Sequence, residues 1–407
     1  MRQAANPTPL LFGFSFLASA SYVLTRALAV SLFLARIGPG ALPGALAVSA
    51  FAAIGVSLTT RALMRGHSTA RYATVSWLLL AVASGVLAFS IGPHHHSIWV
   101  LGGLYVLAEV RSALGTIYVV SLSSEAFSGS GSKHPFAVVS SGAPIAGVVM
   151  GLLLGLEASI AQAGTILIVI AALDTLTAAL VWRGRQRLAK AKATREGDRP
   201  RAEPVVPRSS FRAYRFDLAG LVALKMVVLT LIAFQWKVAA AEHYGTDETA
   251  LVAYFAFFYA FSDILIVLIQ WLVSGRLLDR FGLRVALFGF PVLAALVGLA
   301  LFLSPTGFAT FAVLTVANGL NVLRRSIHDP ALTAAYTALH PGVRRETIVM
   351  VKGVIKPFAE AATGVALVLS GAILMSGGLT IAWLAVVAIW FAFAVRTIRG
   401  YRAAARP

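Results

Sequence analysis

The sequence predicts an all-α polytopic membrane protein with twelve transmembrane helices in two six-helix bundles. The first observation is composition: 58% of the 407 residues are hydrophobic, 12% are charged, and the mean hydropathy is +0.83. The second is that apolar runs of about 20 residues, enough to cross a bilayer core, recur along the chain. The third is that Lys and Arg are concentrated in alternate connections between these runs.

Twelve apolar runs define the expected spans. Each must be helical, because a backbone polar group without a partner is costly in lipid. The expected spans are residues 9–35, 41–61, 73–92, 98–121, 135–156, 162–182, 217–241, 249–274, 285–303, 307–326, 347–374 and 379–397.

Charge in the connections gives the expected orientation. The basic connections and tail hold Arg61, Arg65, Arg71, Lys133, the residues 183–216, Arg276, Arg280, Arg284, Arg324, Arg325, Arg344, Arg345 and Arg396–Arg406. The alternate connections hold almost no Lys or Arg. The positive-inside rule then places both termini in the cytoplasm, in a bacterial inner membrane. Topology therefore explains the net charge of +18, and no nucleic-acid partner is expected.

The only long polar stretch, residues 183–216, carries eleven Lys or Arg and three acids. It predicts a mobile cytoplasmic linker with a short helix near 183–194. The expected domains are an N-terminal bundle, 1–182, this linker, and a C-terminal bundle, 217–407, which ends in a short basic tail. Two six-helix halves of this kind are a common transporter architecture.

A basic motif lies between the eighth and ninth expected spans, at residues 275–284. Glycines allow a sharp turn, and an acid among arginines can cap or bind a neighbouring helix end. The pattern resembles the loop motif of the major facilitator superfamily, which implies a gating loop. Its residues are Gly275, Asp279, Arg280, Gly282 and Arg284.

Small residues recur at near-helical spacing in the fifth expected span, at Gly142, Gly147, Gly151 and Gly155. This pattern predicts close packing against other helices.

Ionisable side chains at membrane depth are costly, so each is a candidate for function. Pairing between facing helices is the alternative, and it is left open for each residue. The candidate substrate-binding residues are Arg26, Glu109, Arg111, Lys225, Asp263, Lys352, Lys356 and Glu360; Asp174 and Lys237 complete the set. Six basic groups against four acids favour an anionic or zwitterionic substrate.

A closer resemblance covers about half the chain. Tyr105–Tyr118 followed by the glycine-rich fifth span, Leu323-Arg-Arg-Ser326 with Asp329-Pro330, and Arg344–Lys352 are similar to the ATP/ADP translocase family. That resemblance implies nucleotide binding by charged residues of several helices. Carried over by position, these would be Glu109, Asp263 and Lys352 or Lys356, with Arg26 or Arg61 as the basic residue of the first helices.

We therefore expect a monomeric secondary transporter that moves a small organic anion, a nucleotide being one candidate, by rocking two bundles about a central site. One alternative is a proton-coupled exporter with Asp263 or Glu109 as the proton carrier. Another is a membrane partner protein that does not transport. The sequence shows no nucleophile–base set and no Walker lysine, and it has no cysteine. No enzyme activity, cofactor or metal is expected, and three adjacent histidines, His94–His96, fit an outer loop.

Overall fold

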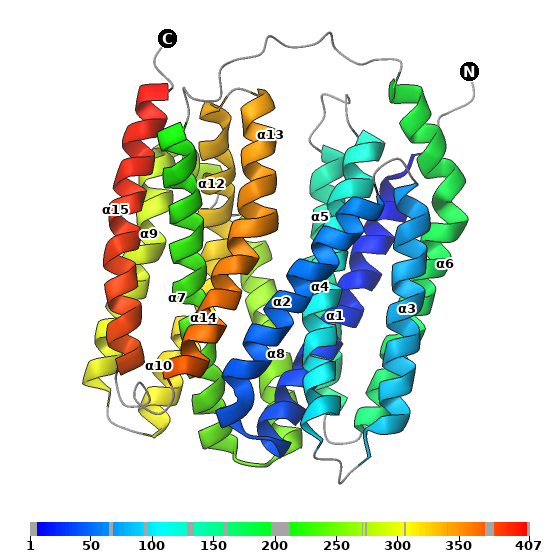
Figure 1. The fold of residues 1–407 in the computed structure, drawn as a ribbon, viewed down its shortest axis with the longest axis horizontal. Coiled ribbons are helices and arrows are strands. Elements are labelled where there is room, and N and C mark those ends of the chain that lie inside the picture. The colour runs from blue at the N-terminus through cyan, green and yellow to red at the C-terminus, as the bar shows by residue number, and fades with distance from the viewer. Residues whose placement is uncertain are drawn as a thin grey trace. The chain divides into compact units, whose positions relative to one another are not determined.

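The computed structural model describes residues 6–64, 68–92, 97–127, 134–157, 162–196, 212–270, 272, 275–304, 307–339, 341–370 and 378–404. Helices dominate these ranges, and they contain no β-strand (Figure 1). The histidines at 94–96 lie outside these ranges. Arg345 lies within them, but its side chain is not described.

The first nine long helices are continuous. They are α1 Thr8–Arg36, α2 Leu42–Leu63, α3 Thr69–Ser90, α4 Ile98–Phe127, α5 His134–Glu157, α6 Ala163–Glu196, α7 Arg212–Tyr244, α8 Glu248–Ile269 and α9 Gly275–Leu303; a short 3₁₀ turn, η1 Pro39–Ala41, precedes α2. The last helix, α15 Gly378–Ala404, is also continuous.

Two segments near the C-terminus are interrupted by π-helical turns. The first runs through α10 Phe308–Gly319, α11 Asn321–Leu323, the π-turn η4 Arg324–His328, α12 Asp329–Ala335 and the 3₁₀ turn η5 Tyr336–Ala338. The second runs through α13 Pro341–Met350, the π-turn η6 Val351–Ile355 and α14 Lys356–Ser370. π-Turns inside helices often occur at functional sites.

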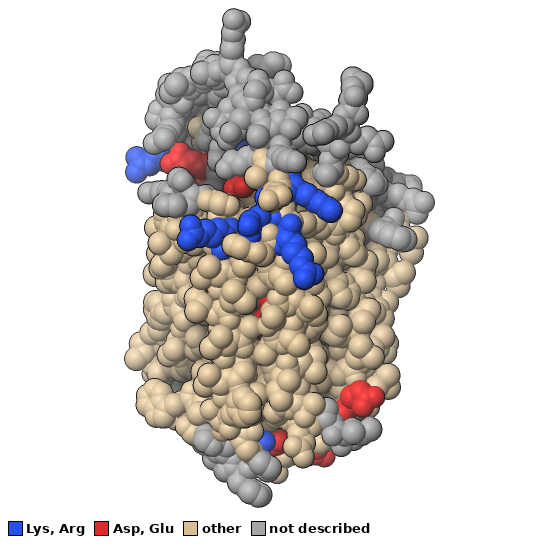
Figure 2. Space-filling view, turned by 90° about the vertical axis from the view of Figure 1, so that its right-hand side faces the viewer, with Lys and Arg blue, Asp and Glu red and all other residues tan. Residues whose placement is uncertain are grey.

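The predicted membrane-spanning pattern is confirmed. Within the described ranges, eleven helices are long and apolar enough to cross a membrane. The expected tenth span, 307–326, corresponds to the interrupted segment 308–338, whose individual helices are shorter. Figure 2 shows a broad band without charged residues, with Lys and Arg gathered towards one end of this face. Arg71 near the start of α3 and Arg183, Arg185 and Arg187 on the last turns of α6 are exposed, and the two helices pack against each other.

Two details differ from the sequence-based expectation. The helix expected near 183–194 is the continuation of α6, which ends at Glu196, and residues 197–211 lie outside the described ranges. The motif at 275–284 is not a loop, because α9 begins at Gly275. Its leucines and arginines are good helix formers, so the helix absorbs the motif. The side chains of 275–282 are outside the described set, whereas Arg284 is exposed.

The chain divides into two compact units that do not follow its sequence halves. Unit 1 comprises Met1–Ile37, Gly55–Ala202 and Thr246–Ile264, and unit 2 comprises Gly38–Ile54, Glu203–Gly245 and Leu265–Pro407. The start of α2 therefore belongs to unit 2, and most of α8 belongs to unit 1. Each unit is described by itself.

In unit 1, α1 is the central helix and packs on α4, α5 and α6. Its core includes Phe14, which meets the ring of Trp77 edge to face at 6.0 Å. The glycine stripe on α5 makes the predicted close contacts. A Cβ at Gly142 would lie 3.0 Å from the carbonyl oxygen of Phe12 on α1, and one at Gly151 would lie 2.8 Å from that of Ala256 on α8.

In unit 2, α7 has the corresponding central place and packs on α10, α14 and α15. The start of α2 packs on α14, where a Cβ at Gly364 would lie 2.8 Å from the backbone nitrogen of Ala47. Asp217 of α7 pairs with Arg396 of α15 at 2.9 Å. The central helices α1 and α7 therefore contact most of the other long helices of their own units.

Replacing Gly151 by Ala is expected to destabilise unit 1 by about 1–3 kcal/mol, because the new methyl group collides with a backbone carbonyl that cannot rotate away. The measurement is thermal unfolding of the purified protein in detergent. Gly115→Ala on α4 is the matched control, since its added Cβ meets nothing within 4 Å. Equal melting temperatures for the two variants would contradict this packing.

Candidate substrate-binding residues in the two units

Arg26 in unit 1 lies among aromatic side chains near the middle of α1. Its guanidinium donates a hydrogen bond to the Tyr22 hydroxyl at 2.9 Å and lies 4.7 Å from the centre of the Tyr259 ring of α8. Tyr105 and Glu109 of α4 are close enough to interact with it electrostatically. Arg26 and Glu109, two of the predicted site residues, are therefore brought together from α1 and α4.

The accessible face of α1 ends at this cluster. Partly exposed residues follow helical spacing from the start of α1, at Phe12, Phe16, Ser19, Tyr22 and Arg26. Beyond Arg26, every residue from Ala27 to Leu34 is buried. Arg26 is therefore the last residue before this buried stretch whose side chain keeps some exposure, although its guanidinium itself packs against Tyr22 and Tyr259.

Arg111 has a different environment, since it is fully enclosed in unit 1. It forms a 2.5 Å ion pair with Asp174 of α6, and both side chains are 0% exposed. The guanidinium also donates to the hydroxyls of Thr25 on α1, at 2.6 Å, and Ser84 on α3, at 2.8 Å. Four helices are thus tied to one ion pair, which gives Arg111 a structural role in unit 1.

The carboxyl group of Asp263 on α8 packs against Gly147 of α5. Asp263 is 6% exposed, and a Cβ at position 147 would collide with its Oδ2 atom. The absence of a side chain at 147 makes room for the acid. Asp263 is therefore more enclosed than Glu109, which is half-buried.

Unit 2 contains a second group of charges, centred on Asp329. Lys225 of α7 donates a hydrogen bond to Asp329 Oδ1 at 2.7 Å, and Arg324 donates to Oδ2 at 3.1 Å. The Lys225 side chain is 5% exposed, Arg324 19% and Asp329 35%. One carboxylate therefore holds two cations, which leaves this group with a positive excess.

The π-turn η4 explains how Arg324 and Asp329 meet. Residues five apart on an α-helix point about 140° away from each other, since each residue turns the helix by about 100°. Here the backbone N–H of Asp329 bonds to the carbonyl of Arg324, which stacks the two residues one turn apart. Both side chains then lie on the same side of the helix and form the ion pair.

The predicted basic residues of the eleventh span are placed unequally. Lys352 lies in the π-turn η6 and is exposed, whereas Lys356, the first residue of α14, is half-buried. Lys356 is near enough to repel Lys225 electrostatically. Glu360, one turn further along α14, is also half-buried. Lys356 therefore belongs with Lys225, and Lys352 stands further towards solvent.

Asp329 and His328 were missed as site residues. His328 is fully buried, and its ring lies 5.8 Å from that of Phe290 and 5.7 Å from that of Trp390. Both residues fall beyond the expected end of the tenth span at 326, so they were treated as connection residues. Two features of the sequence could have indicated them: the acid at 329 lies five residues after Arg324, and Asp329-Pro330 is a pattern typical of a helix start.

Solved structures share this fold at low sequence identity. A POT family transporter in complex with 5-aminolevulinic acid has a TM-score of 0.71 and 12% identity, over 98% of this chain and 96% of that one. The nucleoside transporter NupG has a TM-score of 0.65 and 11% identity, over 97% and 99% of the two chains. A bacterial homologue of the iron transporter ferroportin in an inward-facing state has a TM-score of 0.64 and 16% identity, over the full length of both.

The chain has the major facilitator fold. No protein-family model matches the sequence, and no curated protein matches it either. At identities of 11% to 16%, the likeness concerns the fold alone. The comparison proteins are all transporters by name, and they carry nucleosides, peptides or metals rather than one class of substrate.

Removing one partner of the enclosed ion pair should be strongly destabilising. Asp174→Asn is expected to lose about 3–5 kcal/mol, because the Arg111 charge remains buried without its counter-charge. The double variant Arg111→Met/Asp174→Leu should recover most of that loss, since neither charge is then buried.

Thermal unfolding in detergent measures both effects. Arg183→Gln, which removes an exposed charge from the end of α6, is the control and should unfold like the parent protein. A single variant as stable as the parent, or a double variant no more stable than Asp174→Asn, would contradict a structural role for the pair.

Proposed function

We propose that this protein is a secondary active transporter of a small organic anion. The observation that carries the proposal is the positive excess in unit 2. Lys225, Arg324 and Lys356 are three cations, and Asp329 and Glu360 are two carboxylates, so the group has a net charge of +1. An excess of this kind at membrane depth is costly unless an anion or water compensates it. A substrate anion would supply the missing negative charge.

The residues available suit an oxyanion. Lys and Arg form short, charge-assisted hydrogen bonds with carboxylates and phosphates. Asp329 already accepts such bonds from Lys225 and Arg324, so its carboxylate shows how a substrate group could be held. Lys356 adds a further cation beside Lys225. We assign substrate binding in unit 2 to Lys225, Lys356 and Arg324.

Unit 1 contains its own group of candidate residues. Arg26 and Glu109 balance each other, and Tyr22, Tyr105 and Tyr259 surround them. Tyrosine rings and a guanidinium plane can stack on a flat organic group. A nucleotide carries both kinds of group, a phosphate and a flat base, and it is the substrate that the resemblance of the sequence to the ATP/ADP translocase family implies. A nucleotide is therefore the first substrate to test.

We further propose the orientation and state of the protein. The exposed arginines on α3 and α6 gather at one end of the helices, which fits cytoplasmic termini in an inner membrane. The major facilitator fold of a single chain fits a monomer that works by alternating access.

Lys356→Ala is expected to reduce uptake about tenfold or more, because one charge-assisted bond to the anion contributes about 1.5–3 kcal/mol. A thermal-shift screen of nucleotides, phosphates, amino acids and lipids first selects the substrates. Uptake of these substrates into liposomes then measures the effect of the variant. Arg71→Gln, which removes an exposed arginine near the start of α3, is the control. If Lys356→Ala transports every selected substrate like the parent protein, the assignment of Lys356 is wrong.

A proton-coupled exporter is the alternative, and one observation favours it: Glu109 is half-buried, and Arg26 and tyrosines lie nearby. In such a cycle Glu109→Gln would abolish the response to a pH gradient, because the amide cannot carry a proton. Asp263→Asn gives the same test for the second acid. Transport by the parent protein that is unaffected by a pH gradient would exclude this alternative.

A further inference from the structure

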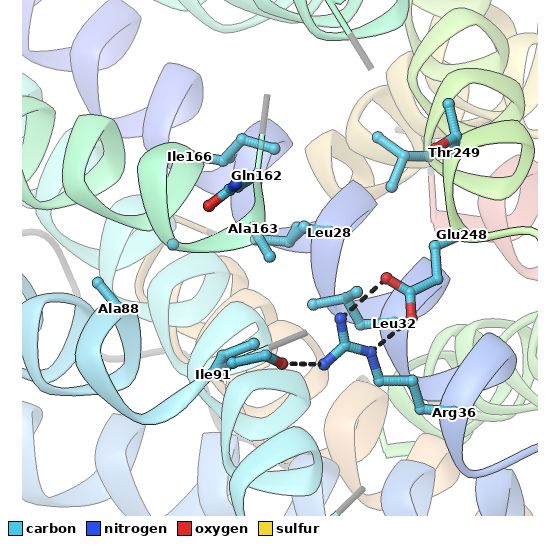
Figure 3. A pocket seen from close by; sticks show the side chains of 13 residues that line it. Leu28, Leu32, Arg36, Ala88, Ile91, Gln162, Ala163, Ile166, Glu248 and Thr249 are labelled. Atoms are coloured by element: carbon cyan, nitrogen blue, oxygen red, sulfur yellow. Dashed lines mark hydrogen bonds and ion pairs between the residues drawn. The ribbon is translucent and has the colours of Figure 1, made fainter. Parts of the chain in front are cut away.

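One pocket in unit 1 lies away from the residues assigned above. Its volume is about 530 Å³, within the range that binds small organic ligands. It is formed by the end of α1, the end of α3, the start of α6 and the start of α8. The lining is apolar at Leu28, Leu32, Ile91, Ile166 and Val252, and it is polar at Arg36, Gln162, Glu248 and Thr249 (Figure 3).

Arg36, at the last position of α1, is the main cation of this pocket. Its Nε and NH2 atoms donate to the two carboxylate oxygens of Glu248 at 2.5 and 2.9 Å, and NH1 donates to the carbonyl of Gly92 at 2.7 Å. Figure 3 shows this two-pronged contact at the edge of the pocket. Arginine binds any carboxylate or phosphate through the same fork. Glu248 therefore occupies the position that an external oxyanion would take.

The pair can open at a lower cost than the enclosed pair Arg111–Asp174. The Glu248 side chain is 37% exposed, so water can solvate it, whereas Asp174 is 0% exposed. Each charge also has a second source of stabilisation, because a cation is favoured at the C-terminus of a helix and an anion at the N-terminus. Arg36 ends α1, and Glu248 begins α8.

The Gly92 carbonyl adds a further feature. It holds one nitrogen of Arg36 independently of Glu248, so the guanidinium stays directed at the pocket when Glu248 leaves. Glu248 also links the start of α8 to the end of α1 through this ion pair, across 212 positions of sequence. Displacing it would free the start of α8 from α1.

We propose that this pocket is an entry site for the transported anion, in which a substrate carboxylate or phosphate replaces Glu248 on Arg36 and releases α8 from α1. This rests on the proposed function, because it assumes an anionic substrate. The pocket adds a second anion contact, separate from Lys225 and Lys356 of unit 2. Its recognition element is the arginine fork, and its apolar wall accepts the carbon part of the substrate.

The test uses the lack of cysteine in the chain. Val252→Cys places a single thiol in the pocket wall, where Val252 is 6% exposed, and Gln162→Cys is a second reporter at the exposed start of α6. A membrane-impermeant maleimide is applied to the full-length protein in liposomes. The labelling rate is measured with and without inorganic phosphate or succinate as the anion probe.

The expected result is faster labelling with either anion. Glu248→Gln should label about tenfold faster without any anion, because about one charge-assisted bond to Arg36 is lost. Its labelling rate should no longer respond to anions. Arg36→Gln, which removes the fork, should also label faster without any anion and should show no anion response. Glu242→Gln, an exposed acid near the end of α7, is the charge control and should behave like the parent.

Three results would overturn the proposal. The first is labelling that ignores both anions in the parent protein. The second is an anion response that survives in Arg36→Gln, since the arginine fork is then absent. The third is an anion response lost in Lys356→Ala, which would locate the effect in unit 2. None of these depends on uptake, so the proposed function is judged separately by the uptake of Lys356→Ala.

Discussion

The enclosed ion pair between Arg111 and Asp174 is the interaction on which unit 1 depends. Two full charges without any exposed area are tolerated only with partners in place, and these partners come from four helices: Thr25 of α1, Ser84 of α3, Arg111 of α4 and Asp174 of α6. Such a network fixes the helices against one another, because separating α4 from α6 would leave a buried charge unpaired, and moving α1 or α3 would remove a hydrogen bond to the buried guanidinium.

That network also sets the neighbouring candidate site. Thr25 accepts a bond from Arg111, and the next residue along α1, Arg26, points to the Tyr259 ring. On α4, Arg111 and Glu109 are likewise two positions apart and lie in different surroundings, one enclosed and one half-exposed. The ion pair therefore holds α1 and α4 in the register that brings Arg26 and Glu109 together. Thr25 and Arg111 therefore stabilise the unit, and their near neighbours Arg26 and Glu109 form the candidate site.

Unit 2 uses a different device for its charges. The π-turn η4 places Arg324 and Asp329 on one side of the helix, where Lys225 of α7 also reaches the carboxylate. A second π-turn, η6, ends beside Lys356. Each inserts an irregular turn into a membrane segment, which is tolerated inside protein because neighbouring groups can bond the freed backbone. The arrangement gathers cations and leaves them incompletely neutralised.

The sequence by itself determined where most of the helices lie, although it ended the tenth span at residue 326 and the interrupted segment continues to 338. Apolar runs long enough for a bilayer mark them, and the glycine spacing on α5 correctly indicated close contacts, because both depend only on residues near in the chain. It also indicated the ionisable residues within the apolar runs, although not Asp329, which lies beyond the expected tenth span.

Only the tertiary structure decided what those charges do. Arg111 is enclosed while Arg26 is half-exposed, and Asp329 beyond the expected span joins Lys225, because partners on other helices and local π-turns set these outcomes. The assignment of most of α8 to unit 1, and with it the contact of Arg36 with Glu248, follows from packing between segments far apart in sequence. Hydropathy measures the transfer of each residue into lipid, and it contains no information about which residues meet.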